Sequence, residues 1–172
     1  MTTPFPTSRV AELMSKPVVT VTPSDSILYA VSRMVENNVG CVIVIQGSVV
    51  GIITERDILK QTRAGIDFMQ VPAREVMSKP VVTATVNDDP LKALSIMAEK
   101  KIRRLPVLHE RKLVGIVTER DLVRWILTNP DLIIALLSES ALPTLSKESL
   151  AAFFSDLSPR RGLQKSEARA RR

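Results

Sequence analysis

A threonine and an aspartate, three residues apart, occur twice in nearly the same turn. "GIITERDIL" contains Thr54 and Asp57, and "GIVTERDLV" contains Thr118 and Asp121. Each aliphatic run ends at the threonine, so that residue is a candidate helix N-cap and the aspartate would close a capping box. A hydroxyl beside the free amides of a helix N-terminus can also meet a phosphate, and a nearby carboxylate can accept hydrogen bonds from two ribose hydroxyls. Spacing alone favours the caps, and the two roles are compatible.

The two turns close two copies of one longer unit. The segment "LMSKPVVTVTPSDSILYAVSRMVENNVGCVIVIQGSVV" begins at Leu13, and "VMSKPVVTATVNDDPLKALSIMAEKKIRRLPVLHERKLV" begins at Val76. The copies are offset by 63 residues at these starts (76 − 13) and by 64 at Gly51 and Gly115 (115 − 51). The extra residue falls in the polar link before each motif. Because insertions are tolerated at hairpin tips, we expect a hairpin there.

The strands of each unit can be read from its apolar runs. Short β-branched runs at 17–21 and 80–84 predict a first strand in each copy. Apolar runs at 41–45 and 105–108 predict buried second strands, each followed by an antiparallel partner. A sheet this small cannot cover both of its faces, so we expect the two units to pack together, sheet against sheet.

Two helices complete each unit. Asp25 and Asp88 lie in polar stretches that suit N-caps, and apolar residues at helical spacing follow both of them. A second helix begins at the threonine of each repeated turn. The fold class is therefore α/β (α+β), with two strand–helix–strand–strand–helix repeats and a helical extension after them.

The pattern stops repeating after Trp125. "NPDLIIALLSES" predicts a helix over 130–139, capped by Asn129, and a capping box at Ser146 predicts another over 146–157. The expected organisation is repeat 1 at 9–64, a linker at 65–75, repeat 2 at 76–127, a helical extension at 128–158 and a basic, disordered tail at 159–172.

Composition excludes several kinds of site. The chain has one cysteine, Cys41, and one histidine, His109, so a His/Cys metal cluster and an internal disulfide are excluded within one chain. A Ser-His-Asp triad would need His109, which lies in a predicted hairpin tip rather than in a pocket. No apolar run approaches the ~18 residues of a membrane span, and the N-terminus has no signal-peptide pattern, so we expect a cytoplasmic protein without membrane contact.

The positive charge of the chain is concentrated at its end. The net charge is +6, and residues 159–172 hold six basic residues against one acidic residue, which gives +5. These arginines suit salt-sensitive contacts with nucleic-acid phosphates, although no aromatic residue is present there to stack on bases. A solubilising tail is the favoured interpretation.

The whole arrangement resembles the cystathionine β-synthase (CBS) domain family. "VMSKPVVTV"-like starts, "NNVGCVIVI", "IRRLPVL" and the two "GI(I/V)TERD" turns are similar to its motifs, in order and twice, over roughly residues 9–127. The resemblance implies a Bateman module, in which two repeats pack back to back around two clefts. Such clefts bind adenosyl ligands: AMP, ADP, ATP or S-adenosylmethionine. The resemblance also implies regulation rather than catalysis, no catalytic cofactor, and a homodimer.

The resemblance assigns roles to residues of this chain. It implies that Asp57 and Asp121 bind ribose and that Thr54 and Thr118 lie beside phosphate. It further implies that two residues at strand starts, Val18 and Val81, line the adenine pocket. The basic residues before "LPVL", Arg103 and Arg104, are implied to reach phosphates.

The two repeats differ at the basic positions. Repeat 1 has Gly40 and Cys41 where repeat 2 has Arg103 and Arg104. Arginine offers forked, charge-assisted donors to phosphate, so we expect one cleft to favour phosphorylated nucleotides and the other to be weaker, empty or suited to a less charged ligand. A solvated basic face is an equally good interpretation of the arginine pair.

The sequence therefore predicts a non-enzymatic module that senses adenosine-containing ligands and acts through a homodimer or through a protein partner on the C-terminal helices. One alternative is a nucleic-acid-associated regulator that uses the basic tail. The other alternative is a structural dimerisation module with empty clefts.

Overall fold

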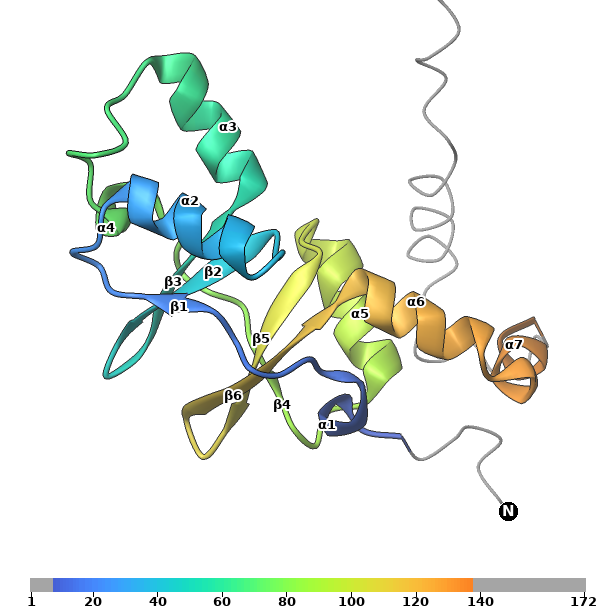
Figure 1. The fold of residues 1–172 in the computed structure, drawn as a ribbon. Coiled ribbons are helices and arrows are strands. Elements are labelled where there is room, and N and C mark those ends of the chain that lie inside the picture. The colour runs from blue at the N-terminus through green and yellow to red at the C-terminus, as the bar shows by residue number, and fades with distance from the viewer. Residues whose placement is uncertain (1–7, 138–172) are drawn as a thin grey trace, which may run out of the picture.

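The computed structural model describes residues 8–137, with side chains as far as Ile133. Its elements form two similar units followed by one more helix (Figure 1). In chain order they are α1 (Val10–Leu13), β1 (Thr20–Val21), α2 (Ile27–Glu36), β2 (Cys41–Gln46), β3 (Ser48–Thr54), α3 (Glu55–Ala64), α4 (Ala73–Val76), β4 (Ala84–Thr85), α5 (Pro90–Lys100), β5 (Arg104–His109), β6 (Lys112–Thr118), α6 (Glu119–Leu127) and α7 (Pro130–Leu137).

Each unit contains a three-stranded sheet of the same topology. The orders are β1-β2-β3 and β4-β5-β6; the first pair of each sheet is parallel and the second antiparallel. The two units meet where β3 and β6 contact each other. The predicted α/β class and element order are confirmed. The first strands are shorter than predicted and begin later, and each predicted run starts at a proline that has no N–H to donate to a ladder.

The hairpin tips account for the change of offset. In repeat 1 a single residue, Gly47 at φ 71°, separates β2 from β3. In repeat 2 two residues, Glu110 at φ 47° and Arg111 at φ 66°, separate β5 from β6. Two successive residues with positive φ are typical of the tight turn that matches strand twist. The predicted position of the extra residue is confirmed.

The caps of the first helices lie one residue later than predicted. Ser26 caps α2 by accepting a hydrogen bond from the Tyr29 amide, and Asp89 caps α5 by accepting two from backbone amides. Asp25 and Asp88, the expected caps, instead accept hydrogen bonds from the backbone amides three residues before them, at 2.6 and 2.7 Å. They close the turn that leads into each helix, so the prediction of Asp25 and Asp88 as caps was wrong.

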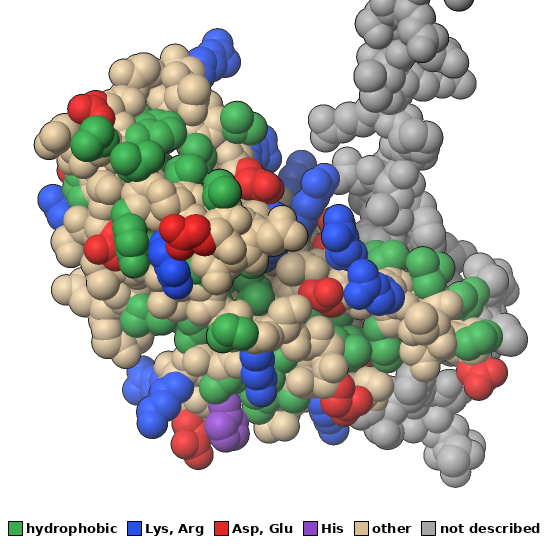
Figure 2. Space-filling model, viewed as in Figure 1, with side chains coloured by type: hydrophobic (Ala, Val, Ile, Leu, Met, Phe, Trp, Pro, Cys, Tyr) green, Lys and Arg blue, Asp and Glu red, His purple; other side chains and the backbone are tan. Residues whose placement is uncertain are grey.

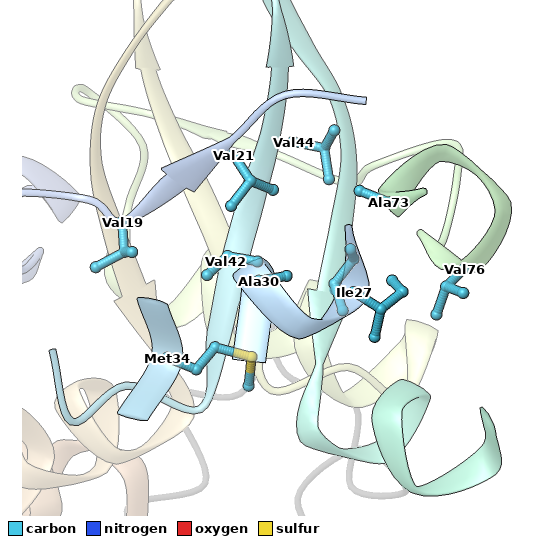
Figure 3. Close-up of a cluster of buried hydrophobic side chains, with 10 residues drawn as sticks. Val19, Val21, Ile27, Ala30, Met34, Val42, Val44, Ala73 and Val76 are labelled. Atoms are coloured by element: carbon cyan, nitrogen blue, oxygen red, sulfur yellow. The ribbon is translucent and has the colours of Figure 1, made fainter. Parts of the chain in front are cut away.

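The short helix at the start of each repeat packs on the other repeat. The Val10 amide in α1 donates to the Asp88 carbonyl at 3.0 Å, and the Ala73 amide in α4 donates to the Asp25 carbonyl at 2.7 Å. Val10 is buried in the core of repeat 2, while α4 lies in the core of repeat 1 (Figure 3). The segment at 65–75 therefore contributes to the first core as well as joining the repeats. The core residues of repeat 1 are Val19, Val21, Ile27, Ala30, Met34, Val42, Val44, Ile53, Ala73 and Val76.

The residues after α1 and after α4 each pair with the sheet of the other repeat, and we call them the exchanged segments. A methionine in each of them lies on a glycine of that sheet. Met77 lies over Gly51 in β3, and Met14 lies over Gly115 in β6. A Cβ at either glycine would overlap with the methionine side chain, so these positions admit only glycine without movement. The backbone continues the contact, because Ser78 pairs with Ile52 in the same way that a serine next to Met14 pairs with β6.

The last described helix covers repeat 2. Leu132 of α7 is fully buried against Leu91 and Trp125. The helix predicted over 130–139 is present as α7, whereas the helix predicted over 146–157 and the tail at 159–172 lie outside the described residues. None of the helices within 8–137 has both the length and the apolar character that a membrane crossing requires.

Candidate functional site

The first repeated turn forms a capping box between β3 and α3. Asp57 Oδ2 accepts a hydrogen bond from the Thr54 amide at 3.0 Å and another from the Thr54 hydroxyl at 2.6 Å. β3 ends at Thr54 and α3 begins at the next residue, so Thr54 is the N-cap. Asp57, one helical turn later, accepts the hydrogen bond of the Thr54 amide. The hydroxyl and the carboxylate thus lie together at the helix N-terminus, as the T-x-x-D spacing predicts.

The second turn forms the same box between β6 and α6. Asp121 Oδ2 accepts from the Thr118 amide at 2.9 Å and from the Thr118 hydroxyl at 2.6 Å, and the hydroxyl oxygen accepts from the Asp121 amide at 3.3 Å. The capping interpretation is confirmed for both copies. Each threonine hydroxyl has its one proton committed to its aspartate, so the free backbone amides are the donors that a phosphate at either helix N-terminus would meet.

The two aspartates differ at their second oxygen. Asp57 is only 7% exposed, and its Oδ1 lies 3.4 Å from the Ser78 hydroxyl and 3.6 Å from the Lys60 ammonium. Asp121 is half-buried, and across the described residues no side chain bonds to its Oδ1. Arg124, which takes the place of Lys60 in repeat 2, forms no such ion pair within that part of the chain. Asp121 Oδ1 is therefore available as a hydrogen-bond acceptor, whereas Asp57 Oδ1 already contacts Ser78 and Lys60.

The valines predicted to line the adenine pocket lie in the exchanged segments, which pair with the opposite sheet just before each box. Val81 comes three residues after Ser78, which pairs with Ile52 just before the first box. Val18 comes three residues after Ser15, which pairs with Ile116 just before the second box. Each valine is half-buried and follows, in its own segment, a serine that pairs with the sheet of the other repeat.

Arg104 extends from one repeat to the other. Its backbone in β5 lies opposite Thr118, and its guanidinium lies 3.5 Å from the carboxylate of Glu55, the residue after Thr54. Arg104 also lies over Gly40, where a Cβ would overlap with the guanidinium and crowd the Glu55 carboxylate. In the view of Figure 2, basic side chains run from the edge of α3 toward the start of α6, with acidic side chains beside them.

Arg103 pairs with a carboxylate of its own repeat. Its Nε lies 3.5 Å from the carboxylate of Glu119, whose amide donates to the Arg103 carbonyl at 3.0 Å. The Arg103 side chain is 62% exposed, compared with 28% for Arg104. The two arginines, for which the sequence predicts the same role, therefore have different surroundings. The exposure of Arg103 fits the interpretation of a solvated basic face better than that of Arg104 does.

Cys41 occupies the position in repeat 1 that Arg104 occupies in repeat 2. It lies opposite Thr54 and is buried, as expected for a small core residue. Burial raises the pKa of its thiol, the nearby Arg104 charge partly lowers it, and Glu55 raises it again. The thiol is therefore protonated at neutral pH and is a poor nucleophile.

The side chains that could bind a metal ion are not grouped in the part of the chain that the structure describes. No group of three or more His, Cys, Asp or Glu side chains is placed there to hold a metal ion. The chemistry that this region offers is hydrogen bonding to hydroxyl groups by carboxylates, and to anions by hydroxyl, amide and guanidinium donors.

Comparison with known proteins assigns this architecture to a family. The sequence matches the model of the CBS domain twice, over residues 10–63 and 73–128. The CBS domain-containing protein YhcV of Bacillus subtilis (strain 168) is 40% identical over 116 residues, which cover 67% of this chain and 83% of YhcV. The chain spans 61% of the uncharacterized protein MK0525 of Methanopyrus kandleri and 32% of MJ1404 of Methanocaldococcus jannaschii.

Solved structures share the fold. A protein with CBS domains from Burkholderia ambifaria MC40-6 aligns with a TM-score of 0.66 and 28% identity, over 71% of this chain and 96% of that chain. The CBS domain pair of protein MJ0100, solved in complex with 5′-methylthioadenosine and S-adenosyl-L-methionine, aligns with a TM-score of 0.64 and 29% identity, over 69% and 99%. Two sequence matches and a shared architecture show that the chain belongs to the CBS domain family and carries a tandem pair of CBS domains.

Proposed function

We propose that this chain is a non-enzymatic regulatory module that binds adenosine-containing ligands at its two capping boxes. The observation that carries the proposal is the pair of Thr-x-x-Asp boxes, each approached by a valine-bearing segment from the opposite repeat. The CBS pair of MJ0100, at 29% identity, was solved with two adenosyl compounds. AMP, ADP, ATP and S-adenosylmethionine are the candidate ligands, and none of them acts as a catalytic cofactor.

Each predicted site residue has a physical role in this proposal. Asp57 and Asp121 accept hydrogen bonds from the two ribose hydroxyls, and the free amides of α3 and α6 donate to phosphate. The hydroxyls of Thr54 and Thr118, which donate to the aspartates in the structure, exchange that bond for one to the phosphate. Val18 and Val81 provide apolar contact for adenine. Arg103 and Arg104 supply positive charge for the phosphate groups of the ligand.

The two sites have unequal affinities in this proposal. A ribose at Asp57 has to replace the contacts of Oδ1 with Ser78 and Lys60, whereas the corresponding oxygen of Asp121 has no described partner to lose. Displacing existing partners costs binding free energy. The box of Thr118 and Asp121 is therefore the tighter site.

Regulation requires the ligand to favour one state of the module. A ligand shifts an equilibrium only as far as its affinities for the two states differ. We propose that this shift reaches a homodimer partner or a protein bound near α7, which packs directly on α6. A cytoplasmic location is part of the same proposal.

Thermal unfolding with each candidate ligand tests the function. A ligand at about 100 times its dissociation constant stabilises the folded chain by about 2.7 kcal/mol, so at least one adenosyl compound should raise the melting temperature. Asp57→Ala and Asp121→Ala should each reduce that rise. Asp89→Ala is the matched control, because it also removes a capping aspartate, but on α5.

The control separates binding from stability. Asp89→Ala should lower the melting temperature of the unliganded chain while keeping the full ligand-induced rise. If no adenosyl compound raises the melting temperature of the unaltered chain, the proposed function is wrong. If the variants at the two boxes keep the full rise, the assignment of the site is wrong.

A further inference from the structure

Arg104 is placed between the two repeated turns. Its backbone pairs with Thr118 of the second turn, while its guanidinium lies 3.5 Å from Glu55, the first helical residue of the first turn. One side chain therefore joins the N-terminus of α3 to the strand that leads into α6. Any anion held between the two boxes would compete with Glu55 for this guanidinium.

The contact has no equivalent in the opposite direction. The counterpart of Arg104 in repeat 1 is Cys41, a buried thiol that carries no positive charge. The counterpart of Glu55 is Glu119, which pairs with Arg103 of its own repeat. Gly40 makes the crossing possible, because a side chain there would occupy the space of the guanidinium. Among the described residues, the Glu55–Arg104 pair is thus the ion pair that joins the two repeats, and this cross-repeat link has no counterpart in the opposite direction.

The link is weak enough to be exchanged. Glu55 is 68% exposed and its contact with Arg104 is a single one at 3.5 Å, longer than a charge-assisted hydrogen bond. A phosphate carries more charge than a carboxylate and can accept two parallel hydrogen bonds from a guanidinium. Phosphate is therefore the stronger partner for Arg104 once it is held nearby.

We propose that Glu55 is a specificity-determining residue, which competes with the phosphate of a bound ligand for Arg104. This inference rests on the proposed function. A phosphorylated adenosyl ligand takes Arg104 from Glu55 and breaks the cross-repeat link, whereas adenosine binds and leaves the link in place. Glu55 thereby lowers the affinity for phosphorylated ligands alone, and only these ligands uncouple the two turns.

A double-mutant cycle with two probes tests the competition. AMP and adenosine are titrated calorimetrically into the full chain and into Glu55→Gln, Arg104→Gln and the double variant. Glu55→Gln should tighten AMP binding by up to about fivefold, the upper end for an exposed ion pair, and leave adenosine unchanged. In the Arg104→Gln background the same change should have no effect on AMP. Raising the salt concentration should reduce the gain.

Glu119→Gln is the matched control. It removes the same charge from the same position of the other turn, but its partner is Arg103 rather than the cross-repeat arginine. The ratio of AMP affinity to adenosine affinity should rise less in this variant than in Glu55→Gln, because Arg103 is 62% exposed and solvent screens its charge more than that of Arg104. Thermal unfolding of each unliganded variant shows whether the fold is retained, because all three altered side chains are partly or largely exposed.

Three results would overturn the inference. If Glu55→Gln tightens AMP equally with and without Arg104, the carboxylate acts by simple repulsion of phosphate. If adenosine gains as much as AMP, or Glu119→Gln gives the same gain, Glu55 has no special role. If the unaltered chain binds neither probe, the inference fails, whereas the proposed function fails only if ADP, ATP and S-adenosylmethionine also leave the melting temperature unchanged.

Discussion

The two repeats have the same capping box but different surroundings. In repeat 1 the aspartate is almost fully buried, and its second oxygen faces Ser78 and Lys60. In repeat 2 the aspartate is half-buried, and the same oxygen has no bonded side chain among the described residues. The comparison shows that duplicating a motif preserves its local cap, while residues one turn away or on the opposite repeat decide what the cap is free to bind.

The largest expected difference between the repeats is in the stability of the two aspartate variants. Asp57→Ala leaves the Thr54 amide and hydroxyl without their acceptor and also removes the contacts with Ser78 and Lys60. We expect a loss of about 2–3 kcal/mol in the free energy of unfolding, compared with about 1–2 kcal/mol for Asp121→Ala. Urea denaturation of both variants measures the difference. Equal losses would show that the additional contacts of Asp57 contribute nothing.

The next effect concerns the methionines that lie on the sheet glycines. The new Cβ of Gly51→Ala would lie 2.8 Å from the Cβ of Met77. The new Cβ of Gly115→Ala would lie 3.2 Å from the Cβ of Met14, so it is less crowded. Overpacking costs about 1–3 kcal/mol, so both variants should be destabilised, and Gly51→Ala more strongly. Thermal unfolding checks the order. If Met14→Ala, which removes the crowding side chain, does not lessen the cost of Gly115→Ala, crowding by methionine is not the cause.

A smaller effect isolates the ion pair at Asp57. Lys60→Gln removes a largely exposed ammonium 3.6 Å from Oδ1, so we expect a loss of less than about 1 kcal/mol that disappears at high salt. The matching change Arg124→Gln, in repeat 2, should have a smaller and salt-insensitive effect. Unfolding at two salt concentrations measures both. A salt-dependent loss for Arg124→Gln alone would reverse the assignment.

The smallest effect concerns the thiol of Cys41. Burial raises its pKa and the Arg104 charge lowers it, so Arg104→Gln should raise the pKa further and slow alkylation of the native chain at pH 8. Glu55→Gln should act in the opposite direction, because the Glu55 charge raises the pKa. The rate of thiol alkylation as a function of pH checks both signs. An unchanged profile in both variants would mean that neither charge acts on the thiol.

The sequence predicts much of this fold because the duplication supplies internal checks. The change of offset from 63 to 64 locates the hairpin tips, and the T-x-x-D spacing predicts both capping boxes, since these features depend on neighbouring residues only. The caps of α2 and α5 were missed by one residue. Asp25 is followed by Ser26 and Asp88 by Asp89, so two capping residue types compete, and only backbone geometry decides between them.

Contacts between the repeats lie beyond a single sequence. Nothing in the amino-acid sequence indicates that α1 packs on repeat 2, that α4 packs on repeat 1, or that Arg104 reaches Glu55 while Arg103 pairs with Glu119. These contacts depend on how the sheets pack. The Lys60–Asp57 pair is different, because a three-residue spacing on a helix was a visible signal for it.

The central claim, two unequal adenosyl sites, is tested most directly by equilibrium titration of AMP into the unaltered chain, Asp57→Ala and Asp121→Ala. We predict two binding events of different affinity for the unaltered chain. Asp121→Ala should remove the tighter event, and Asp57→Ala the weaker one. Two identical events, or loss of the weaker event in Asp121→Ala, would contradict this account.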